Sequence, residues 1–127
     1  KLISHGLCNQ HCFVYWNNIL YGFGTNIYGE IGKRNKSNKA GYYNTPKKIE
    51  YPGFRSKLFD IKCGNKHTLF LTINGEVFGC GNNLKGQLSK KYKNTGKKYT
   101  IKNIISSNDE LITQIGCCRN ASYILNS

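Results

Sequence analysis

The sequence is poor in acidic residues and lacks the short motifs of the common enzyme classes. Six of its 127 residues are Asp or Glu, so few carboxylates are available to act as a paired acid and base. It contains no nucleophile elbow, no Walker phosphate loop and no metalloprotease helix motif. We therefore expect a protein that is not an enzyme and that needs no cofactor.

Long apolar runs and helical periodicity are also missing. No apolar run approaches the roughly 18 residues that a membrane-spanning helix needs, so we expect no transmembrane segment. No stretch has an apolar stripe with a 3.6-residue period, and the 14 glycines oppose long helices. The sequence therefore favours strands.

What the sequence does contain is an internal repeat. Residues 19–32 recur as residues 76–89, a step of 57, and residues 61–67 recur as residues 113–119, a step of 52. The first recurrence includes three pairs of glycines, namely Gly22 with Gly79, Gly24 with Gly81 and Gly29 with Gly86. A period in this range is typical of arrays in which each unit buries its apolar face only against its neighbours.

The repeat divides the chain into units that belong to one domain. We place them near residues 3–57, 58–110 and 111–127, with the last unit incomplete. The whole of residues 1–127 is interpreted as part of a single domain within a longer protein. Taken alone, such units would leave apolar faces and strand edges bare, so we expect the 127-residue chain to self-associate.

Hairpin signals recur in all three units. Asn74-Gly75 lies between two runs of apolar and β-branched residues, which is a strong signal for a hairpin with a type I′ turn. At equivalent positions the first unit has Asn17-Asn18 and the third has Asn126-Ser127. Asparagine tolerates the left-handed backbone region well, so the turn chemistry is retained.

The recurring glycines do not match a nucleotide-binding loop. The dinucleotide fingerprint needs two residues between its second and third glycines, whereas both copies here have four. No helix signal follows either copy. We interpret these glycines as strand bulges and close backbone approaches.

The repeat resembles that of the regulator of chromosome condensation family. The resemblance is strongest from Ile61 to Leu88 and extends over nearly the whole chain. It implies an all-β fold made of β-propeller blades, each an antiparallel four-stranded sheet, from a seven-bladed ring. The motif residues that the resemblance makes structural are Gly22, Gly24, Gly29, Gly64, His67, Asn74, Gly75, Gly79, Gly81, Gly86, Gln87 and Leu88.

The sequence also departs from the family pattern. The aromatic residue before the second glycine is Phe23 in one copy and Cys80 in the other, and Ser89 replaces a glycine. The repeat histidine, His67, aligns with Gln10 and with Arg119 in the other units. The resemblance implies that His67 bonds a neighbouring backbone and does not act as a base.

Basic residues form two clusters at the same place in the repeat. The chain has 19 Lys and Arg and a formal net charge of +13. The candidate partner-binding residues are Lys33, Arg34, Lys36 and Lys39 in the first cluster and Lys90, Lys91, Lys93, Lys97 and Lys98 in the second. On neighbouring blades they would form one positive rim, suited to an acidic protein surface, chromatin or nucleic acid. The alternative is that these loops are simply solvated.

Cysteine and histidine also gather near the N-terminus. His5, Cys8, His11 and Cys12 lie within eight residues, but no paired Cys-x-x-Cys ligands accompany them, so we expect no metal site. Cys80 takes the place of Phe23 in the repeat, which favours a buried free thiol. Free thiols favour a reducing compartment, the cytoplasm or the nucleus.

Three functions remain open. The first is a propeller scaffold that binds protein partners through its loops, without catalysis. The second, implied by the resemblance, is guanine nucleotide exchange on a Ran-type small GTPase at chromatin. The third is a regulatory propeller attached to a catalytic domain such as a ubiquitin ligase.

Overall fold

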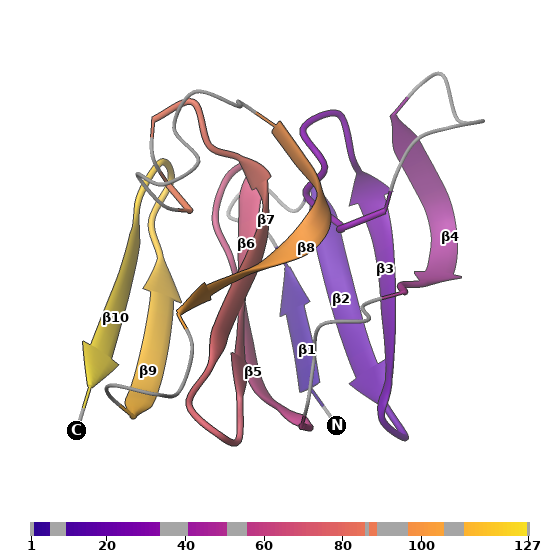
Figure 1. Ribbon diagram of the computed structural model, residues 1–127. Helices are drawn as coiled ribbons and strands as arrows, with labels where there is room; N and C mark the ends of the chain where they lie inside the picture. The colour runs from indigo at the N-terminus through magenta and orange to yellow at the C-terminus, as the bar shows by residue number, and fades with distance from the viewer. Residues whose placement is uncertain are drawn as a thin grey trace.

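The computed structural model describes residues 2–5, 10–33, 41–50, 56–85, 87–88, 97–105 and 111–126. All regular elements in these ranges are strands, and they form three antiparallel sheets (Figure 1). This confirms the all-β fold class expected from the sequence. Within the same ranges there is no helix with the length and apolar character that a membrane crossing requires.

Each of the first two sheets has four strands in sequential order. The first contains β1 (Leu2–His5), β2 (His11–Trp16), β3 (Ile19–Thr25) and β4 (Tyr42–Lys48). The second contains β5 (Leu58–Cys63), β6 (His67–Thr72), β7 (Val77–Asn82) and β8 (Lys97–Ile105). The third sheet consists of β9 (Ile112–Cys117) and β10 (Ser122–Asn126).

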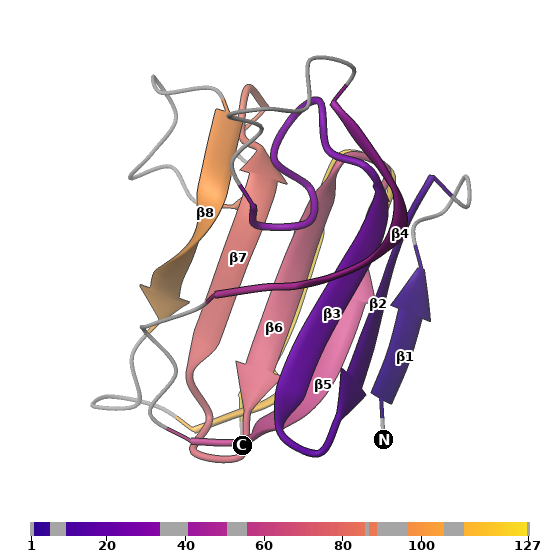
Figure 2. The same cartoon turned by 90° about the vertical axis from the view of Figure 1, so that its right-hand side faces the viewer.

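The sheets follow one another as blades. β1 lies against β5, and β5 lies against β9, so the first strands of successive sheets are neighbours. The fourth strands, β4 and β8, form the opposite sheet edges and diverge from each other (Figure 1). Figure 2 shows the first sheet lying face to face on the second. Sheets that converge at one edge and diverge at the other are arranged as in a propeller.

The first two hairpins form where the sequence predicts them, but only the first has the predicted turn. Asn17 and Asn18 have φ angles of 51° and 63°, as a two-residue type I′ turn requires. In the second hairpin the Gly75 N–H donates to the Thr72 carbonyl at 3.0 Å, so the turn begins one residue earlier. Asn74 is therefore not in the left-handed region, and the expected Asn74-Gly75 type I′ turn is wrong. A type I turn followed by left-handed Gly75, with φ 78°, takes its place.

This additional turn residue changes which residues correspond between the first two sheets. His11 pairs with Gly24, and His67 pairs with Gly81. The counterpart of His67 is therefore His11, and the alignment of His67 with Gln10 is wrong. Because of the longer turn, corresponding residues of β2 and β6 are 56 positions apart in the sequence, whereas those of β3 and β7 are 57 positions apart.

The third sheet requires a similar correction. The Gly64 N–H donates to the His67 carbonyl, and the Cys118 N–H donates to the Ala121 carbonyl, both at 2.8 Å. The counterpart of Gly64 is thus Cys118, and Ala121 stands where the first two sheets have histidine. The expected step of 52 is wrong and becomes 54, and Arg119 does not replace the repeat histidine. Backbone hydrogen bonding fixes this register, which similarity of side chains alone did not show.

Four of the recurring glycines lie at irregularities of the ladder, whereas Gly29 lies in the loop after β3 and Gly86 lies outside the described residues. The pairing between β3 and β4 shifts between Gly22 and Gly24, and that between β7 and β8 shifts between Gly79 and Gly81. Gly81 has φ 107°, and a Cβ there would lie 2.5 Å from the Lys66 carbonyl oxygen. The interpretation of these residues as bulges and close backbone approaches is confirmed.

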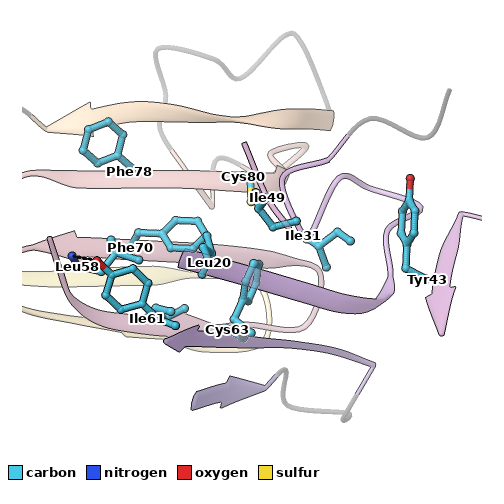
Figure 3. Close-up of a cluster of buried hydrophobic side chains, with 12 residues drawn as sticks. Leu20, Ile31, Tyr43, Ile49, Leu58, Ile61, Cys63, Phe70, Phe78 and Cys80 are labelled. Carbon is cyan, nitrogen blue, oxygen red and sulfur yellow. Dashed lines mark hydrogen bonds between the residues drawn. The ribbon is translucent and has the colours of Figure 1, made fainter. Parts of the chain in front are cut away.

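Two apolar clusters join the three sheets. The first lies between the first and second sheets, where the Phe13 and Phe70 rings meet edge to face at 5.3 Å. Figure 3 shows side chains of both sheets meeting there, among them Leu20 and Ile31 from the first and Phe78 and Cys80 from the second. The second cluster joins the other face of the second sheet to β9, and consists of Leu69, Leu71, Val77, Leu88, Ile112 and Ile115.

Candidate functional site: sheet junctions and basic outer strands

Two of the basic residues predicted as a partner-binding rim, Lys97 and Lys98, lie on a fourth strand, and further lysines of both fourth strands accompany them. Lys47 and Lys48 are exposed at the end of β4, and Lys97 and Lys98 begin β8. Lys47 pairs with Gly22, and Lys102 pairs with Gly79, so these two lysines occupy equivalent positions in the two sheets. Lys33 is half-buried in the segment after β3. Outside the described residues lie Arg34, Lys36, Lys39, Lys90, Lys91 and Lys93.

A chain of hydrogen bonds crosses the junction between the first and second sheets. The Thr68 hydroxyl donates to the carbonyl of Glu30 at 2.7 Å, and the Cys80 thiol donates to the same carbonyl at 3.3 Å. His11 Nε2 lies 3.1 Å from Thr68 Oγ1. All four residues are buried, so these polar groups are satisfied across the junction.

The direction of these bonds fixes the tautomer of His11. A hydroxyl carries one hydrogen, and that of Thr68 is used on the Glu30 carbonyl. Thr68 Oγ1 must therefore accept the bond from His11, so Nε2 of His11 carries the hydrogen. The first sheet therefore donates a hydrogen bond to the second sheet through His11 and accepts hydrogen bonds from it at the Glu30 carbonyl.

His67 forms the equivalent contact at the next junction. Its Nε2 lies 2.9 Å from the hydroxyl of Ser122, the counterpart of Thr68 in β10. A Cβ at Gly64 would collide with the imidazole, which explains why glycine precedes this histidine in the repeat. Burial lowers the pKa of His67 to about 4, although a bond to the Ala121 backbone opposes this shift. His67 is thus neutral near pH 7 and bonds the next sheet.

Two buried loops after the third strands have the same hydrogen bonds, and the sequence analysis did not include the asparagines that accept them among the motif residues. Asn26 Oδ1 accepts from the Ile31 N–H at 3.0 Å, and Asn83 Oδ1 accepts from the Leu88 N–H at 2.8 Å. The two asparagines recur at the step of 57, and that recurrence was available in the sequence.

The same loops show that Glu30 takes the role of Gln87. Glu30 Oε1 accepts from the Tyr28 N–H at 2.6 Å, and Gln87 Oε1 accepts from the Lys85 N–H at 2.9 Å. Both side chains are buried. A carboxyl group in the glutamine position therefore shapes a loop here, in the same way as the amide.

Tyr28 and Lys66 add a contact on the rim of the first junction. The Lys66 ammonium lies 4.7 Å from the centre of the Tyr28 ring and 3.5 Å from its hydroxyl. A cation over an aromatic face contributes roughly 0.5–1 kcal/mol at exposed sites. The loop of the first sheet is thereby held against the second sheet at its edge as well as in its interior.

The thiols are arranged as structural groups. Cys12, Cys63, Cys80, Cys117 and Cys118 are free. Burial raises the pKa of Cys12, raises that of Cys80 well above its ordinary value, and raises that of Cys117 to about 12. These three thiols remain protonated at neutral pH and are poor nucleophiles.

No metal-binding group is found among the described residues. Nowhere in these residues do three or more His, Cys, Asp or Glu side chains come together in a way that could hold one ion. The imidazole of His11 is engaged with Thr68. The side chains of His5 and Cys8, the other members of the N-terminal cluster, lie outside the described residues.

An apolar pocket of about 400 Å³ lies between the β6–β7 turn and the start of β9. Three exposed apolar side chains line it, those of Phe59, Ile73 and Leu111. Phe59 projects from a bulge in β5, where the register with β6 shifts. The second and third sheets therefore leave a hydrophobic surface at the turn end of their junction.

These features define the chain as a set of β-propeller blades whose sheets are joined by repeated polar contacts. Regulator of chromosome condensation (RCC1) repeat models match residues 17–71 and 60–87. Together the two matches span more than half of the chain. The chain belongs to the RCC1-repeat family, as the resemblance in its sequence implies.

Relatives of known sequence agree with this assignment. An RCC1 repeat-containing protein of Schizosaccharomyces pombe is 35% identical over 80 residues, covering 61% of this chain and 22% of that protein. A human RCC1-like G exchanging factor-like protein is 32% identical over 68 residues, covering 54% and 14%. A Dictyostelium discoideum bifunctional serine/threonine-protein kinase/NEDD4-like E3 ubiquitin-protein ligase is 32% identical over 111 residues, covering 84% and 6%. The chain thus spans less than a quarter of each of these proteins.

Solved structures share the fold. Human WBSCR16 superposes with a TM-score of 0.82 at 16% identity, covering 100% of this chain and 30% of that one. Yeast RCC1 (Prp20), in its complex with Kap60, gives a TM-score of 0.78 at 20% identity, covering 98% and 29%. At such low identity these likenesses establish the propeller fold.

Proposed function

We propose that the chain belongs to a non-catalytic propeller scaffold that binds an acidic surface of a protein partner through its basic fourth strands and the loops beside them. The observation that carries this proposal is the equivalence of Lys47 and Lys102 on β4 and β8. Because the fourth strands form the outer sheet edges, successive blades have a lysine at matching backbone positions along these edges. The formal net charge of +13 supports an acidic partner.

Known relatives support a protein partner over a nucleic acid. One solved structure is yeast RCC1 bound to Kap60, and another is described by the binding of Prp20p to Gsp1p and histones. These partners belong to those proteins. They make protein binding the first function to test for this chain, with nucleic acid as an outcome of the same experiment.

The test uses poly-L-glutamate as a defined acidic polypeptide, since the partner is unidentified. We expect binding by the 127-residue chain that weakens at least about tenfold between 50 and 200 mM salt, because exposed charges are screened. Reversing two charges on β4, with Lys47→Glu and Lys48→Glu, should weaken binding at least about fivefold. The control makes the same change of charge away from the fourth strands, with Lys57→Glu and Lys62→Glu.

Two results would overturn this proposal. Equal losses in the two double variants would show that overall charge, and not the fourth strands, governs binding. Tighter binding to duplex DNA than to poly-L-glutamate at matched salt would indicate a nucleic acid partner.

Nucleotide exchange is the second candidate, since the human relative is described as G exchanging factor-like. Release of labelled nucleotide from a Ran-type GTPase, with and without the protein, measures this directly. A scaffold should leave the rate unchanged, whereas an exchange factor should raise it in proportion to its concentration.

A regulatory propeller attached to an enzyme is the third candidate, supported by the kinase and ubiquitin ligase relative. The sequence of the whole gene product separates it from the others, because an appended catalytic domain would be visible there. For all three functions we infer a cytoplasmic or nuclear location, supported by the five free cysteines among the described residues.

A further inference from the structure

The apolar pocket of about 400 Å³ between the second and third sheets is distant in the fold from the basic fourth strands. Residues of β5, of the end of β6 and the turn after it, and of the start of β9 line it. These parts lie at the same end of the two sheets (Figure 1). β5 is paired with β6, and β9 is paired with β10. The walls of the pocket therefore come from paired strands, and β10, the last strand, is not one of them.

At the first junction a tyrosine ring spans the corresponding residues. Tyr15 of β2 is buried, and its hydroxyl accepts from the Leu58 N–H at 3.3 Å, so its side chain extends from the first sheet to the start of β5. The register places Leu71 of β6 at the position of Tyr15, and Ile112 of β9 at the position of Leu58. Both Leu71 and Ile112 line the pocket. A leucine is smaller than a tyrosine, so the second junction lacks the ring that the first junction has.

The rim of the pocket is apolar where the first junction is polar. This pocket rim consists of Phe59, Ile73 and Leu111, which are 58%, 57% and 51% exposed. Ile73 directly follows β6, and the residue that directly follows β2 is Asn17. Leu111 directly precedes β9, and the residue that directly precedes β5 is Lys57. Apolar side chains that gather in this way on a surface mark an interaction site.

The polar groups of the pocket favour an apolar anchor from a partner protein over a polar small molecule. The Thr72 hydroxyl accepts from the Glu76 N–H at 3.1 Å. The Thr113 hydroxyl donates to the Leu125 carbonyl at 3.3 Å, so both hydroxyls are bonded within the chain. Among the described residues, none of those that line the pocket is charged. Small-molecule sites usually contain polar groups that orient the ligand, whereas the central anchor of a protein interface fills an apolar hollow.

We propose that this pocket binds one aromatic side chain of a protein partner. The ring packs against Leu71 and Ile112, in the way that the Tyr15 ring packs between the first and second sheets. Leu71 and Ile112 also belong to the apolar cluster that joins the second sheet to β9, so the bound ring continues an existing interface. Aromatic side chains are enriched among the anchors of protein interfaces. The site is separate from the basic fourth strands and does not depend on the function proposed for them.

The first experiment titrates the 127-residue chain with N-acetyl-tyrosinamide, a capped amino acid that carries the proposed ring. We expect saturable changes in the NMR signals of the methyl groups of Leu71, Ile73, Leu111 and Ile112. N-acetyl-alaninamide has the same backbone groups without the ring, and should bind at least about fivefold more weakly because it buries less apolar surface. Equal binding of the two compounds, or changes confined to other methyl groups, would overturn the proposal.

The second experiment distinguishes a protein partner from a free aromatic compound. Short peptides are selected from a random library for binding to the chain. If a protein supplies the ring, the selected peptides should share an aromatic residue and bind at least about tenfold more tightly than N-acetyl-tyrosinamide, because flanking residues add contacts. Selected peptides without an aromatic residue would overturn the proposal. If no peptide binds more tightly than N-acetyl-tyrosinamide, the site takes a free aromatic compound and the proposed protein partner is wrong.

A matched pair of double variants tests the location of the site without altering the buried core. Ile73→Asn with Leu111→Lys gives the pocket rim the residues of the first junction, and should weaken binding of the selected peptides at least about tenfold. Ile27→Asn with Leu84→Lys makes the same changes at exposed apolar residues outside the pocket, and should change binding less than about threefold. All four side chains are exposed, so both variants should fold. Equal losses in the two variants would overturn the proposal.

Discussion

The first and second sheets have the same strand order and related sequences, but their central strands differ in burial. Along β2, buried residues alternate with half-buried or exposed ones, whereas every residue of β6 is buried. β3 and β7 differ in the same way. The cause is the number of neighbours, since the second sheet packs against the first on one face and against β9 on the other. In a repeat protein, burial depends on the adjacent units as much as on the sequence of the strand.

The largest loss of stability is expected when equivalent residues of β6 and β2 are replaced. Phe70 is fully buried in the first junction, whereas its counterpart Val14 is half-buried on the other face of the first sheet. Phe70→Ala should lower the free energy of unfolding by about 3–5 kcal/mol, because it leaves a cavity against Phe13. Val14→Ala should lower it by less than about 1 kcal/mol. Denaturant unfolding followed by circular dichroism measures both, and similar losses would contradict the difference in burial.

A second test uses the pH dependence that burial gives His67. Its pKa is about 4 in the folded chain and about 6.5 in the unfolded chain, so the unfolded chain binds more protons between these values. Stability should be unaffected by this group above pH 6.5 and should decline as the pH falls towards 4, by about 3 kcal/mol in all.

The variant His67→Gln provides the reference for this measurement. Its thermal unfolding midpoint, followed from pH 7 to pH 4, should fall less steeply than that of the unmodified chain. Parallel pH profiles would mean that the imidazole is solvated, and that β9 and β10 do not cover that face of the second sheet.

The smallest loss of stability is expected when the hydroxyls of Thr68 and Ser122, one at each junction, are removed. Thr68→Val removes a buried hydroxyl that bonds both His11 and the Glu30 carbonyl, and should cost about 1–3 kcal/mol. Ser122→Ala removes the equivalent hydroxyl from a half-buried position, and should cost less than about 1 kcal/mol. Equal costs from parallel melting experiments would show that the two junctions are equally closed.

The fold was largely predictable from the sequence because its signals are local. Glycine spacing and asparagine turns mark the first two hairpins, and the register of β2 with β3 follows from them. The register of β6 with β7 does not, because the turn there has one residue more than the Asn74-Gly75 signal predicts. The counterpart of His67 in the first sheet, His11, was not predictable in this way. One additional residue in the turn before Gly75 shifts the alignment, and only the backbone pairing of His11 with Gly24 corrects it.

The candidate site was less predictable, because its contacts join units far apart in the chain. The His11–Thr68 and His67–Ser122 bonds connect residues 57 and 55 positions apart, and nothing local in the sequence indicates them. The roles of the basic residues and the self-association of the chain remain predictions. Both depend on surfaces formed by several units together, and charge or apolar character alone does not identify their partners.

The hydroxyl of Thr68 has a consequence for how such units can be combined. It accepts from the preceding unit and donates back to it, so the contact has a fixed polarity along the chain. To keep this contact at both of its junctions, a unit grafted between two others would need a hydroxyl that faces the preceding unit, as Thr68 does, and a histidine that faces the following unit, as His67 does. Shuffling of these blades during evolution or by engineering is therefore restricted by the complementarity of hydrogen-bond donors and acceptors as well as by apolar shape.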